Sequence, residues 1–186
     1  MVLVAVTGMP GAGKTDVCSV FVDAGFFRIR FGDATDDVLK QQGLVRNEKN
    51  ERKVREDLRK KHGMAAYAVV SLPRIEQALA KGDVVIEGMY SWEEFKYLRL
   101  QFPSMLVVAV YAPPRLRYAR LMHRKERPLT QEEVESRDYS EVEVLNKGGS
   151  IAMADYTIHN CDSQKALKQS TQQVLEDIRS NGDGVC

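Results

Sequence analysis

The 186-residue chain has little of what marks several protein classes: three cysteines, three histidines, one tryptophan and no long hydrophobic run. The cysteines show neither a disulfide framework nor metal-ligand spacing, and the scattered histidines add no ligand pair. The N-terminal apolar run is too short for a signal peptide or a membrane span, so a cytoplasmic location is the default expectation. A net charge of +1, without aromatic residues interleaved among the basic ones, argues against nucleic acid as a partner.

The strongest motif lies near the N-terminus. Residues Gly8 to Thr15 read GMPGAGKT, which fits the pattern G-x-x-x-x-G-K-[ST] of a phosphate-binding loop. An apolar run over residues 2–6 predicts a buried strand before the loop, and apolar residues at helical spacing predict a helix over 15–24 after it. This context favours nucleotide binding over a glycine-rich turn that binds nothing.

The loop predicts a site for ATP and Mg²⁺. Its glycines let backbone N–H groups turn toward phosphate oxygens, and the helix N-terminus adds positive partial charge. Lys14 is predicted to reach the β- and γ-phosphates, and the Thr15 hydroxyl to bind Mg²⁺. The nucleotide-binding residues expected in this segment are Gly8, Met9, Pro10, Gly11, Ala12, Gly13, Lys14, Thr15 and Asp16.

Apolar runs alternate with helical patterns along the rest of the chain, which predicts a three-layer α/β fold with a five-stranded parallel sheet. The expected strands lie at about residues 2–6, 26–31, 84–86, 105–110 and 156–158. We expect one domain over 1–186, with two hydrophilic insertions: the flap segment, about 36–63, and the lid segment, about 124–149. In a P-loop protein such insertions are expected to bind an acceptor and to close over the site.

Arginines are concentrated in and after one predicted helix, over 114–124. They are Arg115, Arg117, Arg120, Arg124 and Arg127, and Arg137 follows in the lid segment. Phosphoryl transfer needs charge neutralised on phosphate oxygens, and the guanidinium fork binds phosphate bidentately. The alternative is a solvated basic surface paired with Glu126, Glu132 and Glu133, which is the commoner arrangement of exposed charge. Beside a phosphate-binding loop, we favour the phosphate role for Arg124 and Arg137.

Two carboxylates, Asp33 and Glu87, follow predicted strands, where sheets of this kind place their ligand crevice. Asp33 is expected to orient an acceptor hydroxyl or accept its proton, or else to be the N-cap of a helix over 34–42. Glu87 is expected near Mg²⁺, with a surface carboxylate as the alternative.

Further motifs occur in an informative order. They are FGD at 31–33, EDLRKKHG at 56–63, VVIEG at 84–88, APPRLRYARL at 112–121, SRDYSE at 136–141 and ADYTIHN at 154–160. With the phosphate-binding loop, they make nearly the whole chain resemble the nucleoside-monophosphate-kinase branch of P-loop proteins. Within that branch, the chain is most similar to archaeal-type adenylate kinase and dephospho-CoA kinase-related proteins.

The resemblance implies roles for individual residues. It places Arg120 against adenine, Asn160 near the base, Arg124 and Arg137 on the transferring phosphoryl group, Arg59 on the acceptor's phosphate and Asp33 near the acceptor. The chain also departs from the family pattern. No arginine lies within 34–40 or shortly after Gly88, Glu87 stands where the family usually has aspartate, and the lid stretch over 127–129 lacks the usual acidic residues.

The favoured function is therefore an ATP- and Mg²⁺-dependent kinase that phosphorylates a small molecule, either a nucleoside monophosphate or a dephospho-CoA-like acceptor. Its predicted catalytic residues are Lys14, Asp33, Arg124 and Arg137. The two missing arginines motivate an alternative, a nucleotide-binding module or weak NTPase that acts with a protein partner. The residues leave open the identity of the acceptor, the choice of ATP or GTP, and whether the protein is a monomer or a homodimer.

Overall fold

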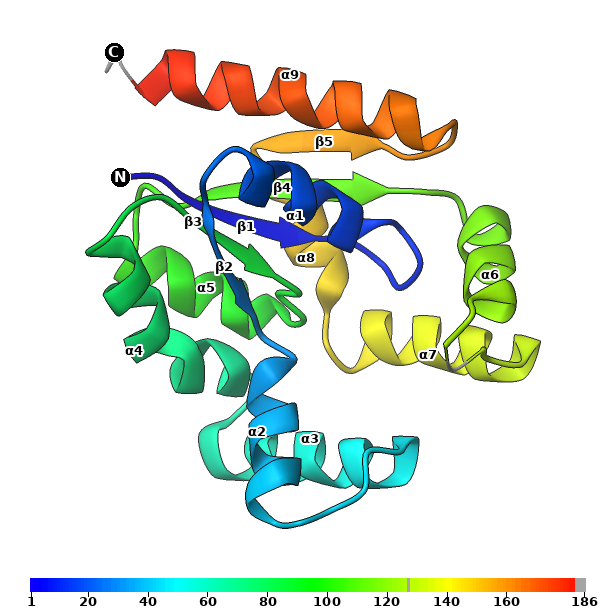
Figure 1. Ribbon diagram of the computed structural model, residues 1–186. Helices are drawn as coiled ribbons and strands as arrows, with labels where there is room; N and C mark the ends of the chain where they lie inside the picture. Colours follow the sequence, from blue (N-terminus) through cyan, green and yellow to red (C-terminus); the bar gives the residue numbers. More distant parts are fainter. Residues whose placement is uncertain (127, 183–186) are drawn as a thin grey trace.

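A parallel sheet of five strands organises the computed structural model, which describes residues 1–126 and 128–182 (Figure 1). The strands are β1 (Leu3–Thr7), β2 (Phe27–Arg30), β3 (Val84–Glu87), β4 (Leu106–Tyr111) and β5 (Tyr156–His159). Their order in the sheet is β2-β3-β1-β4-β5, and every neighbouring pair is parallel. The strands lie where the apolar runs predict them, and the predicted α/β fold class is confirmed.

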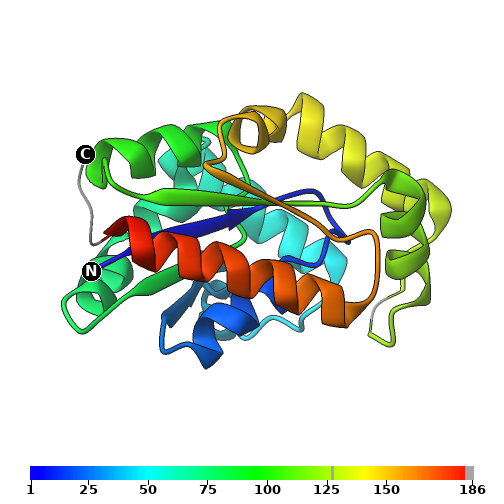
Figure 2. The same cartoon turned by 90° about the horizontal axis from the view of Figure 1, so that it is seen from above.

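Helices cover both faces of the sheet and form the outer two layers (Figures 1 and 2). One face carries α1 (Lys14–Asp23) and α9 (Gln164–Gly182), and the other carries α4 (Ala66–Leu79) and α5 (Trp92–Gln101). Side chains alternate along a strand, so neighbours on β1 enter different cores. Val6 packs with Phe21 on the first face, whereas Ala5 packs with Ile75 on the second.

The remaining helices extend from the sheet where its strands end (Figure 1). They are α2 (Asp33–Gln41), α3 (Glu48–His62), α6 (Pro114–His123) and α7 (Gln131–Glu143), whereas the short helix α8 (Lys147–Ala152) lies against the sheet beside α5 and β4. The flap segment contains most of α2 and all of α3, and the lid segment contains α7. Among the described residues, no helix has both the length and the apolar character that crossing a membrane requires.

Two helix starts follow capping sequences in the chain. Ser91 Oγ accepts a hydrogen bond from the Glu94 amide at 3.1 Å, and the Glu94 carboxylate accepts one from the Ser91 amide. Thr130 and Glu133 form the same reciprocal pair at the start of α7. Both pairs are capping boxes, and they satisfy amides that a helix leaves unbonded in its first turn.

The sheet order determines where a ligand can approach. From β1, the chain continues to β2 and β3 on one side of the sheet and then to β4 and β5 on the other. In open parallel sheets, the crevice at such a reversal, beyond the carboxyl ends of the strands, is the usual ligand site. The phosphate-binding loop leaves the carboxyl end of β1 at this point.

Candidate functional site

The phosphate-binding loop has the backbone conformation that its glycines predict. Gly8, Gly11 and Gly13 all have positive φ, at 141°, 77° and 100°. The loop is also held closely, since a Cβ on Gly8 would lie 2.4 Å from the Val110 carbonyl oxygen. Ala12, between the second and third of these glycines, is fully buried. The loop therefore has a fixed shape in which several amides can face one anion.

Lys14 closes this loop from inside. Its Nζ donates to the carbonyl oxygens of Gly8 at 2.8 Å and Met9 at 3.0 Å. Burial of the ammonium, and then the charge of Lys147, lower the pKa of Lys14 to about 7. Phosphate oxygens are the partners that would favour the charged form of such a group.

Thr15 and Glu87 meet beside the loop. Thr15 Oγ1 donates to Glu87 Oε1 at 2.7 Å, and the other Glu87 oxygen pairs with Arg28 of β2. Glu87 is the last residue of β3 and is 8% exposed, so the alternative of a surface carboxylate does not describe it. Asp16 is exposed in the first turn of α1, one residue beyond Thr15.

This hydroxyl and carboxylate are the donor set that Mg²⁺ uses beside nucleotide phosphates, where the protein supplies only one or two ligands. Within the described residues, no group of three or more acidic, histidine or cysteine side chains could hold a metal without such phosphates. The residues present therefore fit a Mg²⁺ that arrives with a nucleotide.

Arg120 and Asn160 lie on the opposite side of the loop. Arg120 Nη2 donates to the Asn160 carbonyl oxygen at 3.0 Å, and its Nη1 donates to the Gly11 carbonyl oxygen at 3.3 Å. Asn160 Nδ2 donates to the Ala12 carbonyl oxygen at 2.8 Å. The structure thus brings together the two residues that the resemblance assigns to the nucleotide base.

Arg117 is a buried part of the site that the sequence did not reveal. Its guanidinium binds Asp138 of α7 with two hydrogen bonds, at 2.7 and 2.5 Å, and is only 4% exposed. It also donates to the Pro10 carbonyl oxygen at 3.1 Å. The interpretation of the cluster as a solvated surface is wrong for this arginine, because Arg117 ties the lid helix to the phosphate-binding loop.

The other arginines of the cluster have different environments. Arg124 is half-buried at the C-cap of α6, and Arg115 is exposed. Arg137 is exposed on α7, and its charge contributes to lowering the pKa of Lys14. Arg127 lies outside the described residues. The charge of Arg137 on the lid helix thus acts on Lys14 of the phosphate-binding loop.

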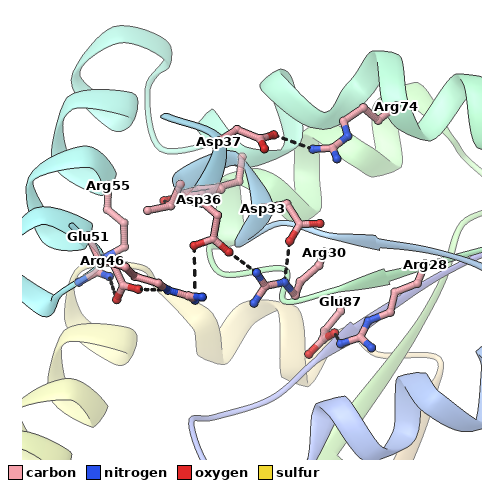
Figure 3. Close-up of polar contacts among 12 residues, drawn as sticks. Arg28, Arg30, Asp33, Asp36, Asp37, Arg46, Glu51, Arg55, Arg74 and Glu87 are labelled. Atoms are coloured by element: carbon pink, nitrogen blue, oxygen red, sulfur yellow. Dashed lines mark hydrogen bonds and ion pairs between the residues drawn. The ribbon is translucent and has the colours of Figure 1, made fainter. Parts of the chain in front are cut away.

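Asp33 lies at the carboxyl end of β2, in a chain of ion pairs that reaches into the flap (Figure 3). Arg30 Nε donates to Asp33 at 2.7 Å, and the same guanidinium pairs with Asp36. Arg46 Nη2 lies 3.4 Å from Asp36, and Arg46 Nε donates to Glu51 of α3 at 2.9 Å. The charges of β2, α2 and α3 are therefore linked.

The alternative role of Asp33 as an N-cap is wrong. Helix α2 begins at Asp33 itself, and Gly32 occupies the cap position. The carboxylate of Asp33 instead binds Arg30, which precedes it on the strand. A cation therefore stands beside Asp33 although residues 34–40 contain no arginine.

Arg59 enters a buried polar cluster between α3, α4 and α5. Its guanidinium lies 5.8 Å from the centre of the Tyr67 ring, and its Nε is buried without a hydrogen-bond partner among the described residues. Glu94 is fully buried there, and its Oε1 likewise has no hydrogen-bond partner in the described part of the chain. Burial raises the pKa of Glu94 to about 7, against the lowering effect of two backbone amides and of Arg59.

The burial of several charged residues at the site is not evident from the sequence, for one reason. Arg28, Arg117, Lys147 and Glu141 are charged, and charged residues are expected on the surface. The strand FRIR offers a signal in hindsight, because Arg28 and Arg30 alternate with apolar residues and so share one face of β2. We found no comparable signal for Lys147.

The phosphate-binding loop, the sheet order and the flanking helices define a P-loop protein with a kinase-like α/β fold. Residues 4–145 match the family model described as AAA domain. The chain is 36% identical over 184 residues to the UPF0200 protein TK1334 of Thermococcus kodakarensis, with 96% of this chain and 98% of that protein covered. The chain therefore belongs to the UPF0200 family, within the AAA-domain P-loop group.

Solved structures have the same architecture. A shikimate kinase from Acinetobacter baumannii in complex with shikimate superposes with a TM-score of 0.59 at 20% identity, covering 97% of this chain and 95% of that chain. A dephospho-CoA kinase from Campylobacter jejuni gives a TM-score of 0.56 at 17% identity, covering 95% and 96%. These likenesses confirm the predicted P-loop kinase-like fold, and at such identities they concern the fold alone.

Proposed function

We propose that this protein is a kinase that transfers the γ-phosphoryl group of ATP to a small acceptor, either a nucleoside monophosphate or a dephospho-CoA-like molecule, with Mg²⁺. The observation that carries the proposal is the position of Asp33 relative to Glu87. Arg30, which binds Asp33, is the register partner of Glu87, which accepts the Thr15 hydroxyl hydrogen bond. A candidate acceptor-binding carboxylate and the candidate metal site thus lie near the carboxyl ends of two adjacent strands, β2 and β3 (Figure 3).

In the proposed reaction, the acceptor oxygen forms a bond to the γ-phosphorus, and the bond from that phosphorus to the β,γ-bridging oxygen breaks. Asp33, held by Arg30, orients the acceptor and, where the acceptor oxygen is a hydroxyl, receives its proton. Lys14 turns from its loop carbonyls to the β- and γ-phosphates. Thr15 and Glu87 hold the Mg²⁺, which neutralises phosphate charge when it is bound.

The lid and flap complete the proposed site. Arg124 and Arg137 approach the transferring group from the lid, where a guanidinium stabilises charge that develops on the equatorial oxygens. On the flap side, the guanidinium of Arg59 supplies the positive charge that binds an anionic acceptor. A nucleoside monophosphate would offer a phosphate oxygen to the γ-phosphorus and dephospho-CoA would offer a hydroxyl, and both are anionic acceptors. A cytoplasmic location, where ATP is supplied, belongs to the same proposal.

The test is transfer of label from γ-labelled ATP with Mg²⁺ to a panel containing the nucleoside monophosphates and dephospho-CoA. Lys14→Ala is expected to abolish transfer. Lys168→Ala, the same change at an exposed position on α9, is the matched control and is expected to retain it. Transfer that survives in Lys14→Ala, or label found only in inorganic phosphate, would contradict the proposal.

One observation favours a second candidate, a nucleotide-binding module or weak NTPase that acts with a protein partner. Arg30, the cation nearest Asp33, is already paired with two carboxylates, and the chain lacks arginine both over 34–40 and shortly after Gly88. This candidate predicts tight nucleotide binding and slow hydrolysis, with no metabolite in the panel becoming phosphorylated.

A further inference from the structure

Lys147 is a buried lysine beside the candidate site. It is the first residue of α8 and is only 1% exposed. Its ammonium forms an ion pair with Glu141 of α7 and lies 5.3 Å from the centre of the Tyr90 ring. Lysine is almost never buried without a partner, so this position is either a structural ion pair or a binding position for an anion.

Helix α8 is fixed against the start of the phosphate-binding loop. Ser150 Oγ lies 3.1 Å from Oγ1 of Thr7, the residue directly before Gly8, and also donates to the Lys147 carbonyl oxygen at 3.0 Å. On its other side, α8 rests on Trp92, since a Cβ on Gly149 would come within 2.7 Å of that ring. Lys147 is therefore held in a fixed position relative to the loop.

The positive charges of Lys147 and Lys14 therefore act on each other. After burial, the charge of Lys147 is the largest influence that lowers the pKa of Lys14. Like charges in a partly dry site repel one another unless an anion lies between them. In the structure, Glu141 supplies negative charge there, because it pairs with Lys147 and opposes the lowering of the Lys14 pKa.

Glu141 lies on α7, the helix that Arg117 connects to the phosphate-binding loop. Asp138 and Glu141 are three residues apart on α7 and therefore share its buried face. Asp138 binds Arg117, and Arg117 donates to the Pro10 carbonyl oxygen. The lid helix thus places the Asp138 carboxylate on Arg117 and the Glu141 carboxylate on Lys147.

We propose that Lys147 is a second phosphate-binding lysine, which exchanges the Glu141 carboxylate for an oxygen of the terminal phosphate when a nucleoside triphosphate binds. The inference rests on the nucleotide binding of the proposed function but not on phosphoryl transfer. It makes Glu141 a competitor of the terminal phosphate. A diphosphate, which lacks that group, leaves the Lys147–Glu141 pair in place.

The experiment measures ATP and ADP affinity by calorimetry, with Mg²⁺ present, for the wild type and three variants. Lys147→Met is expected to weaken ATP binding about tenfold or more, the usual worth of a hydrogen bond to a charged group, with ADP affinity nearly unchanged. Glu141→Gln is expected to strengthen ATP binding, because it removes the competitor and leaves the lysine. Lys147→Met/Glu141→Gln removes both charges and is expected to lose the preference for ATP as Lys147→Met does.

Lys96→Met is the matched control, because Lys96 also lies over an aromatic ring, that of Trp92 at 5.8 Å, but is exposed on α5. It is expected to leave both affinities unchanged. A merely structural ion pair predicts the opposite pattern, in which Glu141→Gln and Lys147→Met weaken ATP and ADP binding equally. If Lys147→Met does not fold, Glu141→Gln and the double variant still decide between the two.

The outcomes separate this inference from the proposed function. An unchanged ratio of ATP to ADP affinity in the folded variants overturns the role of Lys147, even if the wild type phosphorylates an acceptor. A changed ratio in a protein that phosphorylates nothing supports Lys147 while the kinase proposal fails. A wild type that binds neither nucleotide overturns both.

Discussion

The Thr15 hydroxyl donates a hydrogen bond to the Glu87 carboxylate at 2.7 Å, although 72 residues separate the two in sequence. The sheet produces this contact, because β1 and β3 are parallel neighbours in which Val6 is the register partner of Glu87. The first helix after β1 and the last residue of β3 therefore meet at one point. A hydroxyl and a carboxylate at the carboxyl edge of a parallel sheet form a small acidic site that is open to a nucleotide-bound cation.

The first prediction concerns Mg²⁺. Thr15→Val and Glu87→Gln are expected to remove most of the increase in ATP affinity that Mg²⁺ produces, because each variant loses an oxygen ligand or its charge. Without Mg²⁺, Glu87→Gln is expected to bind ATP no more weakly than the wild type, since a negative charge near the phosphates is gone. Calorimetric titrations with ATP, with Mg²⁺ and with a chelator, measure both effects.

The control for this prediction is Ser19→Ala. Ser19 is one helical turn beyond Thr15, and its hydroxyl donates only to the Thr15 carbonyl oxygen among the described contacts. Its Mg²⁺ dependence is expected to match the wild type. Equal losses in Thr15→Val with and without Mg²⁺ would show that the hydroxyl serves the fold alone.

The second prediction concerns the buried pair Arg117 and Asp138. Arg117→Met is expected to reduce the free energy of unfolding by about 3 kcal/mol or more, because it leaves a buried carboxylate without its partner. The double variant Arg117→Met/Asp138→Leu is expected to recover much of that loss. Chemical denaturation measures both, and Arg115→Met on the exposed side of α6 is expected to change little.

ATP affinity separates the two roles of Arg117. The double variant still lacks the donor to the Pro10 carbonyl oxygen, so its ATP binding is expected to stay weaker than that of the wild type after stability has recovered. Full recovery of ATP affinity would mean that the Pro10 contact does not shape the loop.

These pairs show which features of the molecule local sequence can predict. The strand before the phosphate-binding loop, the helix after it and the five strands of the sheet are each determined by residues close together in the chain, and these predictions were confirmed. The partners of charged residues depend on tertiary packing: Arg117 finds Asp138 21 residues away, and Arg28 finds Glu87 59 residues away. A local sequence pattern predicts that each of these charged residues is exposed. It therefore cannot identify which of them are buried and support the site.

The third prediction concerns the proton balance of ATP binding. Because the pKa of Lys14 is about 7 in the structure, most of this lysine is neutral at pH 8 without ligand, and phosphate oxygens favour its protonated form. ATP binding at pH 8 is therefore expected to take up a fraction of a proton approaching one, and less at pH 6. The terminal phosphate titrates near pH 6, so it contributes little at pH 8.

Calorimetry in two buffers that differ in ionisation enthalpy measures this uptake. Lys14→Arg is the control, because arginine stays charged at both pH values, and its uptake at pH 8 is expected to be close to zero. Equal uptake in the wild type and Lys14→Arg would assign the proton to another group.

The fourth prediction concerns stability and pH. The carboxyl group of Glu94 ionises near 4.5 in the unfolded chain but near 7 in the folded one. The folded state therefore holds the extra proton between these values, and stability falls as pH rises from 4.5 to 7, by about 1.4 kcal/mol for each unit of pKa difference. Glu94→Gln is expected to remove this slope and to be more stable than the wild type at pH 8.

Denaturation at pH 5 and pH 8 measures the difference, and Glu76→Gln, at an exposed position on α4, is the control that keeps the wild-type slope. The amide oxygen of glutamine can still accept the hydrogen bonds that Glu94 receives from the Tyr90 and Ser91 amides. A destabilisation of Glu94→Gln that is the same at both pH values would mean that Glu94 stays ionised in the folded protein.

The last prediction compares two glycines with nearly the same backbone conformation, Gly13 at φ 100° and Gly25 at φ 98°. An alanine strains the backbone similarly at both positions, by about 1 kcal/mol. Their surroundings differ, because a Cβ on Gly13 would lie 2.3 Å from Asn160 Nδ2, whereas a Cβ on Gly25 would meet no described atom within 4 Å. Gly13→Ala is therefore expected to destabilise the protein more than Gly25→Ala.

The clash in Gly13→Ala also has a functional consequence. The displaced Asn160 side chain loses its hydrogen bond to the Ala12 carbonyl oxygen in the loop. ATP affinity is expected to fall in Gly13→Ala and to stay at the wild-type level in Gly25→Ala. Asn160→Ala in the Gly13→Ala background makes room for the new methyl group, so it is expected to restore part of the stability but not the ATP affinity. If Gly13→Ala and Gly25→Ala lose equal stability, backbone strain alone explains the effect, and Asn160 does not support the loop.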